Sequence, residues 1–452
     1  MDLEKISMTP VLLVGNGARE HAIAEAIVRS AHSPRLYAFM KTNNPGIASL
    51  AAESRIGHYN DMEAIIAFAR DASCEFAVIG PEDPLSHGVV NALHASGITA
   101  VGPPQSLARL ETSKSFTRNL LEKYGIPGNP RFRNFTSLAG VEAFLDELPG
   151  IVLKPDGLTG GKGVLVQGDH FQTKAEALAH CRSILREHPG VTLEEKLEGE
   201  EFSLQCLCDG ATVLACPPVQ DHKRRFVGDR GPNTGGMGSY SCSDHLLPFL
   251  KETDVAEALE ITRRVAAALL KETGHPYKGV LYGGFMTTAG GIRLIEYNAR
   301  FGDPEAMNVL PLLKTDFIGL CRAIVAGTLA DGDLVFEKKA TVCKYGVPKG
   351  YGLPADHPDA ASTAARIEIG PAPGARLYYS SIDRRVDGLY MTTSRAVGVV
   401  GIADSLEEAE QAAEAAILAI RGPVDHRPDI GTAALIQRRI DHMRQLKGQI
   451  TT

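Results

Sequence analysis

The chain has 452 residues, of which 44% are hydrophobic and 22% are charged, a composition typical of globular proteins. This length is too great for one ordinary hydrophobic core and predicts two to four domains. A formal net charge of -7 argues against a protein that binds nucleic acid through general electrostatics, although local basic pockets for phosphate remain compatible with it.

Targeting and membrane signals are absent from the sequence pattern. The apolar runs fall short of the ~20 residues that a membrane-spanning helix needs, and no signal-peptide core precedes Val11. The eight cysteines are scattered, and Cys206 and Cys208 have the spacing of small apolar residues on one face of a strand. We therefore expect a cytoplasmic protein without membrane or nucleic-acid partners.

Short apolar runs alternate with helical patterns over the first hundred residues. Strands are expected at 11–14, 36–39, 76–79 and 99–101, with helices beginning near Arg19 and covering 62–70 and 86–96. This alternation predicts a doubly wound parallel sheet, in which ligands gather at the carboxyl ends of the strands.

Two of these strands end in turns that could bind a ligand, Gly15-Asn16-Gly17 and Pro81-Glu82-Asp83. The first turn is a weak dinucleotide fingerprint, because Glu20 stands where the third glycine should sit. Free amides at the start of the following helix could still hold one phosphate. The alternative is a turn that needs glycine only for its backbone angles.

A glycine-rich loop lies between two expected strands, 151–154 and 164–167, in a smaller unit that also has helices at 138–147 and 174–187 and a strand at 191–195. Because the loop 156–163 joins strand to strand, it is not a P-loop. It suits a flap that folds over phosphates, with charge from Lys154 and Lys162. The alternative is a flexible hairpin with solvated lysines.

A second glycine-rich stretch, 228–239, has five glycines in twelve residues and follows expected strands at 200–208 and 212–216. We expect it to be irregular and functional, since long loops in compact domains usually are. The specific polar groups in this stretch and just before it are Asp221, His222, Lys223 and Asn233. The alternative is a disordered surface loop.

Residues 294–298 are expected to form a strand, with Leu294, Glu296 and Asn298 on one face and Ile295 and Tyr297 on the other. A carboxylate and an amide oxygen on one face suit a hard cation such as Mg²⁺. Arg300 follows and could bind a carboxylate or phosphate. The alternative is an edge strand whose polar face meets water.

The last hundred or so residues are expected to form a separate unit, with strands at 340–345, 376–380 and 396–402. A helix follows Ser405, which forms a capping box with Glu408. The basic C-terminal helix, which carries Arg438, Arg439, Arg444 and Lys447, is expected to present a solvated face.

Seven motifs together resemble one family over nearly the whole chain. They are 14–21, 80–85, 113–116, 154–163, 220–223, 231–238 and 296–305. The chain is similar to the phosphoribosylamine–glycine ligases (glycinamide ribonucleotide synthetases) of the ATP-grasp superfamily. The loop Gly231-Pro-Asn-Thr-Gly-Gly-Met-Gly238 and the segment Asn298-Ala-Arg-Phe-Gly-Asp-Pro-Glu305 carry most of the specificity.

The resemblance implies a multidomain α/β and α+β architecture. We expect an N-terminal doubly wound domain over 1–113, a central ATP-grasp domain over 114–335 with a mobile lid subdomain at about 130–197, and a C-terminal mixed α/β domain over 336–452.

The resemblance also implies a reaction, the second step of de novo purine (IMP) biosynthesis. ATP, glycine and 5-phosphoribosylamine would give glycinamide ribonucleotide, ADP and phosphate through a glycyl phosphate, with Mg²⁺ or Mn²⁺ bound. The partners would be these small molecules, and the protein would be a monomer or a weak homodimer. The alternatives are another ATP-grasp carboxylate–amine ligase and a catalytically silent nucleotide-binding protein.

Site residues follow from the same resemblance. Those expected to bind the nucleotide are Lys114, Lys154, Gly160, Gly161, Lys162, Gly163, Glu194, Glu195, Lys196, Leu197, Glu201 and Lys223. Glu296 and Asn298 match the metal ligands, and the candidates for holding glycine and the acyl phosphate are Arg300, Asn233 and Asp221. The phosphoribosyl substrate would meet Gly15, Asn16, Gly17, Pro81, Glu82 and Asp83. This last transfer is the least secure, because Thr42-Asn43-Asn44-Pro45-Gly46 replaces the family's usual Pro-Gly-Asn.

Overall fold

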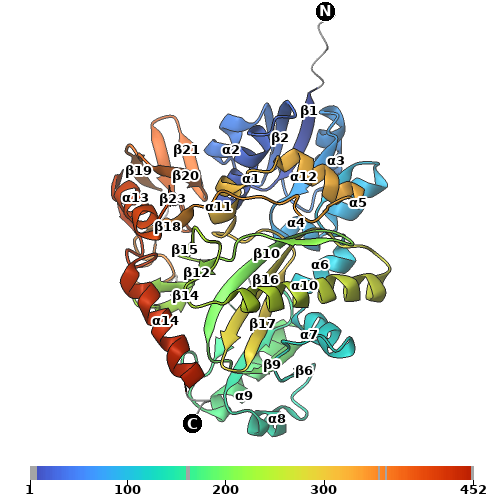
Figure 1. Ribbon diagram of the computed structural model, residues 1–452, viewed down its shortest axis with the longest axis vertical. Coiled ribbons are helices and arrows are strands. Elements are labelled where there is room, and N and C mark those ends of the chain that lie inside the picture. Colours follow the sequence, from blue (N-terminus) through green and yellow to red (C-terminus); the bar gives the residue numbers. More distant parts are fainter. Residues whose placement is uncertain (1–7, 159–162, 355–356, 362–363, 449–452) are drawn as a thin grey trace, which may run out of the picture.

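A five-stranded parallel sheet begins the fold (Figure 1), with the strand order β3-β2-β1-β4-β5. The computed structural model describes residues 8–158, 163–354, 357–361 and 364–448. The sheet consists of β1 (Thr9–Val14), β2 (Pro34–Met40), β3 (Glu53–Ile56), β4 (Phe76–Ile79) and β5 (Thr99–Val101). Its helices are α1 (Ala18–Val28), α2 (Pro45–Leu50), α3 (Met62–Asp71), α4 (Glu82–Ser86) and α5 (Val89–Ala95).

Alternate residues of β1 enter two different cores, which confirms the doubly wound sheet. Leu13 packs in the core that includes α1, and Leu12 packs in the core that includes α3 and α5. The expected helix at 86–96 is present as α5 but begins only at Val89, because Gly88 adopts a left-handed conformation between α4 and α5.

An antiparallel sheet with its own core follows α6 (Gln105–Thr112) and α7 (Lys114–Lys123). We call it the lid sheet: it consists of β6 (Phe132–Phe135), β9 (Val191–Glu195), β7 (Ile151–Pro155) and β8 (Leu165–Val166), packed on α8 (Val141–Glu147) and α9 (Lys174–Glu187). The glycine-rich loop joins β7 to β8 as expected. Gly160, Gly161 and Lys162 lie outside the described residues.

The central sheet has the order β11-β10-β16-β17. Its strands are β10 (Glu200–Asp209), β11 (Val213–Ala215), β16 (Lys278–Thr288) and β17 (Gly291–Asn298), and α10 (Glu252–Thr273) packs against it. Gly284 of β16 pairs with Glu296 and Phe285 pairs with Leu294, so Ile295 is an extra, unpaired residue in β17. This bulge corrects the expected alternation: Leu294 joins Tyr297 in the core, while Ile295 lines a cavity with Glu296.

The stretch 228–239 is not irregular throughout, contrary to expectation. β13 (Arg224–Phe226) and β14 (Arg230–Asn233) form a hairpin, and β15 (Gly238–Ser241) joins a larger sheet of order β12-β15-β18-β23-β20. The count of glycines misled the prediction, because glycine also serves regular structure here: Gly228, with φ of +73°, lies in the hairpin turn, and Gly231, with φ of +82°, lies within β14.

The larger sheet combines strands from before and after residue 336. They are β12 (Gln220–Asp221), β15, β18 (Ala340–Pro348), β23 (Val397–Ala403) and β20 (Ala375–Tyr379), with β25 (Val424–Asp425) paired to β18. A second small sheet contains β21 (Ile382–Arg385), β22 (Gly388–Met391), β19 (Ala365–Ile369) and β24 (Ile420–Arg421). The helices that follow the central sheet in the chain are α11 (Ala306–Val309), η1 (Leu310–Leu312), α12 (Phe317–Ala326), α13 (Leu406–Leu418) and α14 (Ala433–Gly448). The predicted capping box of Ser405 and Glu408 begins α13.

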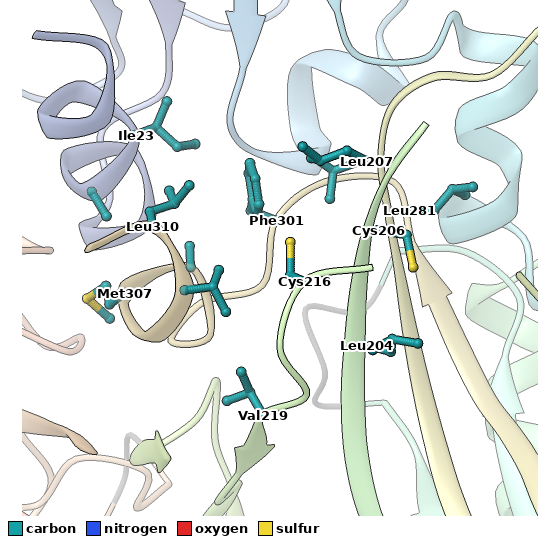
Figure 2. Packing of buried hydrophobic residues seen from close by; sticks show 14 of the residues in the cluster. Ile23, Leu204, Cys206, Leu207, Cys216, Val219, Leu281, Phe301, Met307 and Leu310 are labelled. Atoms are coloured by element: carbon teal, nitrogen blue, oxygen red, sulfur yellow. The ribbon is translucent and has the colours of Figure 1, made fainter. Parts of the chain in front are cut away.

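One hydrophobic cluster joins the N-terminal sheet to the central sheet (Figure 2). It runs from Ile23 on α1 through Phe301 to Leu204 and Cys206 on β10, and the buried Cys206 confirms the expected apolar packing. Phe301 therefore anchors the segment that carries Arg300. None of the helices in the described ranges is both long and apolar enough to cross a membrane.

Candidate functional site

Two cavities meet on the central sheet. The outer cavity, of about 370 Å³, lies between the lid sheet and the central sheet. The inner cavity, of about 220 Å³, lies where the central sheet approaches the N-terminal sheet and the C-terminal region. Asp221, Lys223 and Glu296 line both cavities, so a group in one cavity can reach a group in the other at this shared wall.

Glu296 and Asn298 both line the inner cavity, as the two predicted metal ligands should. They follow the bulge, beyond which the side chains alternate regularly. Burial alone would raise the pKa of Glu296, but the positive charges of Lys223, Lys114 and Lys154 outweigh it and lower the pKa to about 2. Glu296 is therefore a carboxylate at neutral pH.

The carbonyl group of Ile295, the extra residue in β17, accepts hydrogen bonds from two cationic side chains. Arg118 of α7 donates to the carbonyl oxygens of Leu294 and Ile295 at 3.0 and 2.7 Å, and Lys154 Nζ donates to that of Ile295 at 2.7 Å. Glu194 binds both cations, Arg118 at 2.6 Å and Lys154 at 2.8 Å. This buried trio fixes the strand that presents Glu296.

The side chain of Glu194 is thus engaged inside the protein, although the residue was expected to bind the nucleotide. The segment 194–197 and Glu201 do line the outer cavity. Two of its backbone amides are already used: Glu195 N–H donates to Arg131 O, and Lys196 N–H donates to Gly150 O. These two amides are therefore not available to hydrogen-bond an adenine base.

The predicted lysines divide between the cavities. Lys154 lines the outer cavity, Lys114 the inner one, and Lys223 both, with its Nζ 3.6 Å from Glu296 Oε1. Leu158 and Val164, on either side of the undescribed part of the flap loop, both line the inner cavity. Gly163 is half-buried beside Val164.

Arg300 points into the inner cavity but already binds two carboxylates. Its Nε lies 3.1 Å from Glu82 and its Nη2 lies 3.0 Å from Glu111, while Nη2 also donates to Asn298 Oδ1 at 3.2 Å. Burial raises the pKa of Glu111, whereas Arg300 and Arg19 outweigh burial at Glu82 and lower its pKa to about 2. Arg300 is thus fixed in orientation by the protein itself.

The turn at Gly15–Gly17 serves a protein side chain. A Cβ on Gly15 or on Gly80 would lie 2.2 or 2.3 Å from Glu20 Cγ, and Gly17 N–H donates to Glu20 Oε2 at 2.6 Å. The amide of Gly17 is therefore not available to a phosphate, because the side chain of Glu20 accepts its hydrogen bond. The expectation of a phosphate at the other amides of this helix start stays a prediction.

Of the residues predicted to meet the phosphoribosyl substrate, only Glu82 lines the inner cavity. Asn16 instead donates to Thr42 Oγ1 at 2.8 Å, and Asp83 lies 3.3 Å from His87. Pro81 is the N-cap of α4.

Several charged and hydroxyl side chains of the inner cavity were missed by the sequence reasoning: Arg19, Glu111, Tyr282, Asp303, Glu305 and Arg395. Both Arg19 and Glu111 are buried. Arg19 gave a signal, because it lies in the motif 14–21, whereas Glu111 shares its helix with other polar residues and did not stand out. Arg395 gave none. It lies in the loop before β23. It donates to Gly235 O at 2.6 Å and to Asp303 O at 3.2 Å, and it forms an ion pair with Asp303 Oδ1 at 3.2 Å.

Asp221 and Asn233 differ in their surroundings. Burial, and next the charge of Glu305, raise the pKa of Asp221 well above its usual range, and its Oδ1 has no hydrogen-bond partner among the described residues. Asn233, on β14, lines the outer cavity and not the inner one. Asp221 is therefore part of the wall that both cavities share, whereas Asn233 faces only the outer cavity.

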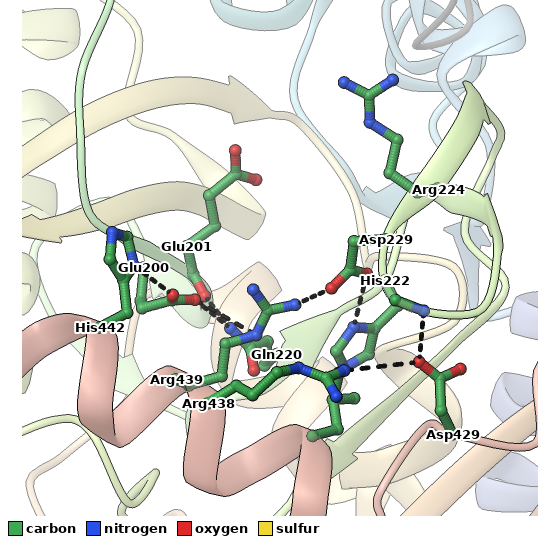
Figure 3. Close-up of polar contacts among 12 residues, drawn as sticks. Glu200, Glu201, Gln220, His222, Arg224, Asp229, Asp429, Arg438, Arg439 and His442 are labelled. Atoms are coloured by element: carbon green, nitrogen blue, oxygen red, sulfur yellow. Dashed lines mark hydrogen bonds and ion pairs between the residues drawn. The ribbon is translucent and has the colours of Figure 1, made fainter.

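The C-terminal helix does not present a uniformly solvated face, contrary to expectation. Arg439 binds Asp229 and lies 3.3 Å from Glu200, and all three line the outer cavity (Figure 3). Its neighbour Arg438 is 56% exposed and fits the expectation.

The donor set at Glu296 and Asn298 fits a hard divalent cation. An ionised carboxylate and an amide oxygen leave further positions for phosphate oxygens and water, as Mg²⁺ prefers. No cluster of three or more His, Cys, Asp or Glu ligands occurs in the described ranges, so a cation here would depend on ligands from a bound phosphate. The surrounding lysines suit such a phosphate.

Known protein families match both the N-terminal domain and the region that contains the two cavities. Residues 9–111 match the N domain of phosphoribosylglycinamide synthetase, and residues 112–306 match its ATP-grasp (A) domain. The phosphoribosylamine–glycine ligase of Methanosarcina barkeri is 46% identical over 97% of this chain and 100% of its own length, and that of Methanocaldococcus jannaschii is 49% identical over 97% and 99%. A crystal structure of the phosphoribosylamine–glycine ligase from Thermotoga maritima superposes with a TM-score of 0.78 at 25% identity, covering 93% of this chain and 100% of that one. The chain belongs to the phosphoribosylamine–glycine ligase family of ATP-grasp enzymes.

Proposed function

We propose that this chain ligates glycine to 5-phosphoribosylamine with ATP, giving glycinamide ribonucleotide, ADP and phosphate through a glycyl phosphate. This is the second step of de novo purine (IMP) biosynthesis. The observation that carries the proposal is the wall of Asp221, Lys223 and Glu296 shared by two cavities. A phosphoryl donor in the outer cavity and a carboxylate in the inner cavity would meet there.

The outer cavity is the proposed ATP site. Lys154 and Lys223 would neutralise the triphosphate, and Lys114 would do so from the inner side. Glu201 and the segment 194–197 would meet the ribose and the base. Asn233, which lines the outer cavity, would hold the transferred phosphate from that side.

The inner cavity is the proposed site of glycine and phosphoribosylamine. Arg300, oriented by Glu82 and Glu111, would hold the glycine carboxylate for in-line attack on the γ-phosphorus. The amine of phosphoribosylamine would then displace phosphate from the glycyl phosphate. Asp221, whose buried Oδ1 has no hydrogen-bond partner among the described residues, would face the reacting groups, and the flap loop would exclude water from the intermediate.

Glu296 and Asn298 would hold Mg²⁺ or Mn²⁺. When bound, the ion neutralises negative charge on the phosphate oxygens during transfer. Because the carboxylate of Glu296 already lies among lysines, we propose that the ion and the nucleotide bind together.

A different ATP-grasp carboxylate–amine ligase is the competing assignment. The full-length identity of 46–49% to relatives named phosphoribosylamine–glycine ligase favours the proposed substrates. The domain limits 1–113, 114–335 and 336–452, a monomeric or weakly dimeric state and a cytoplasmic location remain predictions.

The deciding experiment incubates the protein with ATP, Mg²⁺, glycine and freshly generated phosphoribosylamine and identifies the product by mass. We expect glycinamide ribonucleotide and one ADP for each product formed. Equal turnover with alanine in place of glycine, or absence of the product mass, contradicts the proposal. Omitting phosphoribosylamine is the matched control.

A further inference from the structure

The C-terminal helix α14 contributes to the wall of the outer cavity (Figure 3). The guanidinium of Arg439 donates to Asp229 through Nη2, and its buried Nε lies 3.3 Å from Glu200 as an ion pair without a hydrogen bond. His442, about one turn further along the helix, lies 2.7 Å from the other oxygen of Glu200. The contacts tie the helix to the cavity at two points.

Asp229 lies in a strained turn between β13 and β14. Its φ is +56°, in the left-handed region that residues other than glycine seldom adopt, although Asp tolerates it better than most. Such a conformation persists only where the surroundings hold it. Here the carboxylate binds Arg439, the fully buried Arg427 at 2.7 Å and His222 at 3.5 Å.

Both arginines that hold this turn come from the C-terminal twenty-five or so residues of the described chain. Burial alone would raise the pKa of Asp229, but His222, Arg439 and Arg427 outweigh it and lower the pKa strongly. The turn is therefore shaped by residues some 200 positions away in sequence.

The same hairpin carries residues of the outer cavity. Arg224 and Asn233 pair across β13 and β14 and both line it. Arg224 also binds Asp169, which follows β8 of the lid sheet. A shift of the Asp229 turn would therefore move cavity wall and disturb a contact to the lid sheet.

We propose that Arg439 is a positioning residue of the ATP site. It fixes Glu200 and the Asp229 turn against the outer cavity, so docking of α14 and binding of nucleotide stabilise each other. The proposal rests on the proposed function in one respect, the assignment of the outer cavity to ATP.

Kinetics of paired variants test the positioning role. We expect Arg439→Ala to raise KM for ATP about tenfold, or about 1.4 kcal/mol, with KM for glycine unchanged. Arg438→Ala is the matched control, since Arg438 is exposed and lies 3.9 Å from Asp429, outside the cavity wall. Arg439→Lys should be intermediate, because lysine keeps the charge and loses the forked donor geometry.

A double variant separates this role from general destabilisation. If Arg439 acts through the turn, Asp229→Ala should raise KM for ATP little further in an Arg439→Ala background. Fully multiplicative effects would contradict that route. Equal KM for ATP in wild type and Arg439→Ala overturns the proposal.

Hydrogen exchange supplies a readout that needs no turnover. Because coupling between two binding events is reciprocal, ADP with Mg²⁺ should slow amide exchange over 433–448 in the wild-type protein. The effect should vanish in Arg439→Ala and shrink in Arg439→Lys, which also decides the matter if the alanine variant folds poorly. Exchange over 433–448 that ADP leaves unchanged overturns the proposal.

The two proposals fail separately. A wild-type protein that makes no glycinamide ribonucleotide overturns the proposed function. Slower amide exchange over 433–448 in the presence of ADP would still support the role of Arg439. A wild-type protein that makes the product, with Arg439→Ala matching it in KM for ATP, overturns only this inference.

Discussion

Lys223 Nζ and Glu296 Oε1 lie 3.6 Å apart at the wall that the outer and inner cavities share. Each residue favours the charged form of the other: Lys223 lowers the pKa of Glu296, and Glu296 raises that of Lys223, in both cases against burial. The pair is therefore ionised at neutral pH. A phosphate with its cation could enter here by separating the two charges.

Removing the carboxylate should abolish the reaction while sparing the fold. We expect Glu296→Ala to lower kcat at least about 10²–10³-fold, the range found when one preorganised electrostatic group is lost. The measurement is ADP formation that depends on both glycine and phosphoribosylamine. Glu252→Gln, at an exposed position of α10, is the control. Near wild-type turnover in Glu296→Ala would remove this residue from the metal site.

Arg300 should matter for stability as well as for activity. Glu111, whose side chain is only 4% exposed, would lose its cation in Arg300→Ala. Breaking a buried pair in this way costs about 3–5 kcal/mol of unfolding free energy. Urea denaturation measures the loss, which should far exceed the ~0.5 kcal/mol expected for Arg264→Ala on the exposed face of α10. Similar costs for both variants would mean that the pair with Glu111 contributes little.

The sequence predicted those parts of the site that local patterns determine. Short apolar runs followed by glycine turns indicated the parallel sheet, and the two-residue spacing of Glu296 and Asn298 indicated a shared face. Both follow from the geometry of single elements, and the structure bears them out.

Contacts between distant segments could not be predicted in the same way. The bulge at Ile295 depends on Arg118 and Lys154, which bind its carbonyl group from other elements. Arg300 forms ion pairs with Glu82 and Glu111, and the sequence spacing of these three residues does not predict that they are in contact. The resemblance supplied residue types, but the partners that orient them come from tertiary structure.

A methyl group added at Gly236, in the second glycine-rich stretch (228–239), should disturb the wall that the two cavities share. Gly236 has φ of +109°, and a Cβ there would lie 2.8 Å from Asp221 Oδ1 and 2.8 Å from Pro304 Cδ. We expect Gly236→Ala to lower kcat/KM for glycine about 10²-fold by displacing Asp221. Gly274→Ala is the matched control, since it also has positive φ, +73°, but nothing within 4 Å. It should cost about 1–2 kcal/mol of stability and leave kcat/KM unchanged; equal losses of activity would implicate backbone strain alone.

The pH dependence of stability should reveal the charge of Glu296. Its pKa falls from an ordinary 4.5 to about 2 in the folded protein, so the ionised group stabilises the fold above pH 4.5 and loses that effect as the pH falls toward 2. The contribution is about 3 kcal/mol at most, at 1.36 kcal/mol per pKa unit.

Denaturation of wild type and Glu296→Gln between pH 8 and pH 2.5 measures this contribution. The difference in unfolding free energy should be constant above about pH 5 and shrink below it, because protonated glutamate and glutamine are both neutral. Glu252→Gln corrects for the loss of one negative charge at an exposed position. A difference that stays constant down to pH 2.5, or that grows as the pH falls, would show that the lysines around Glu296 do not stabilise its carboxylate in the folded protein.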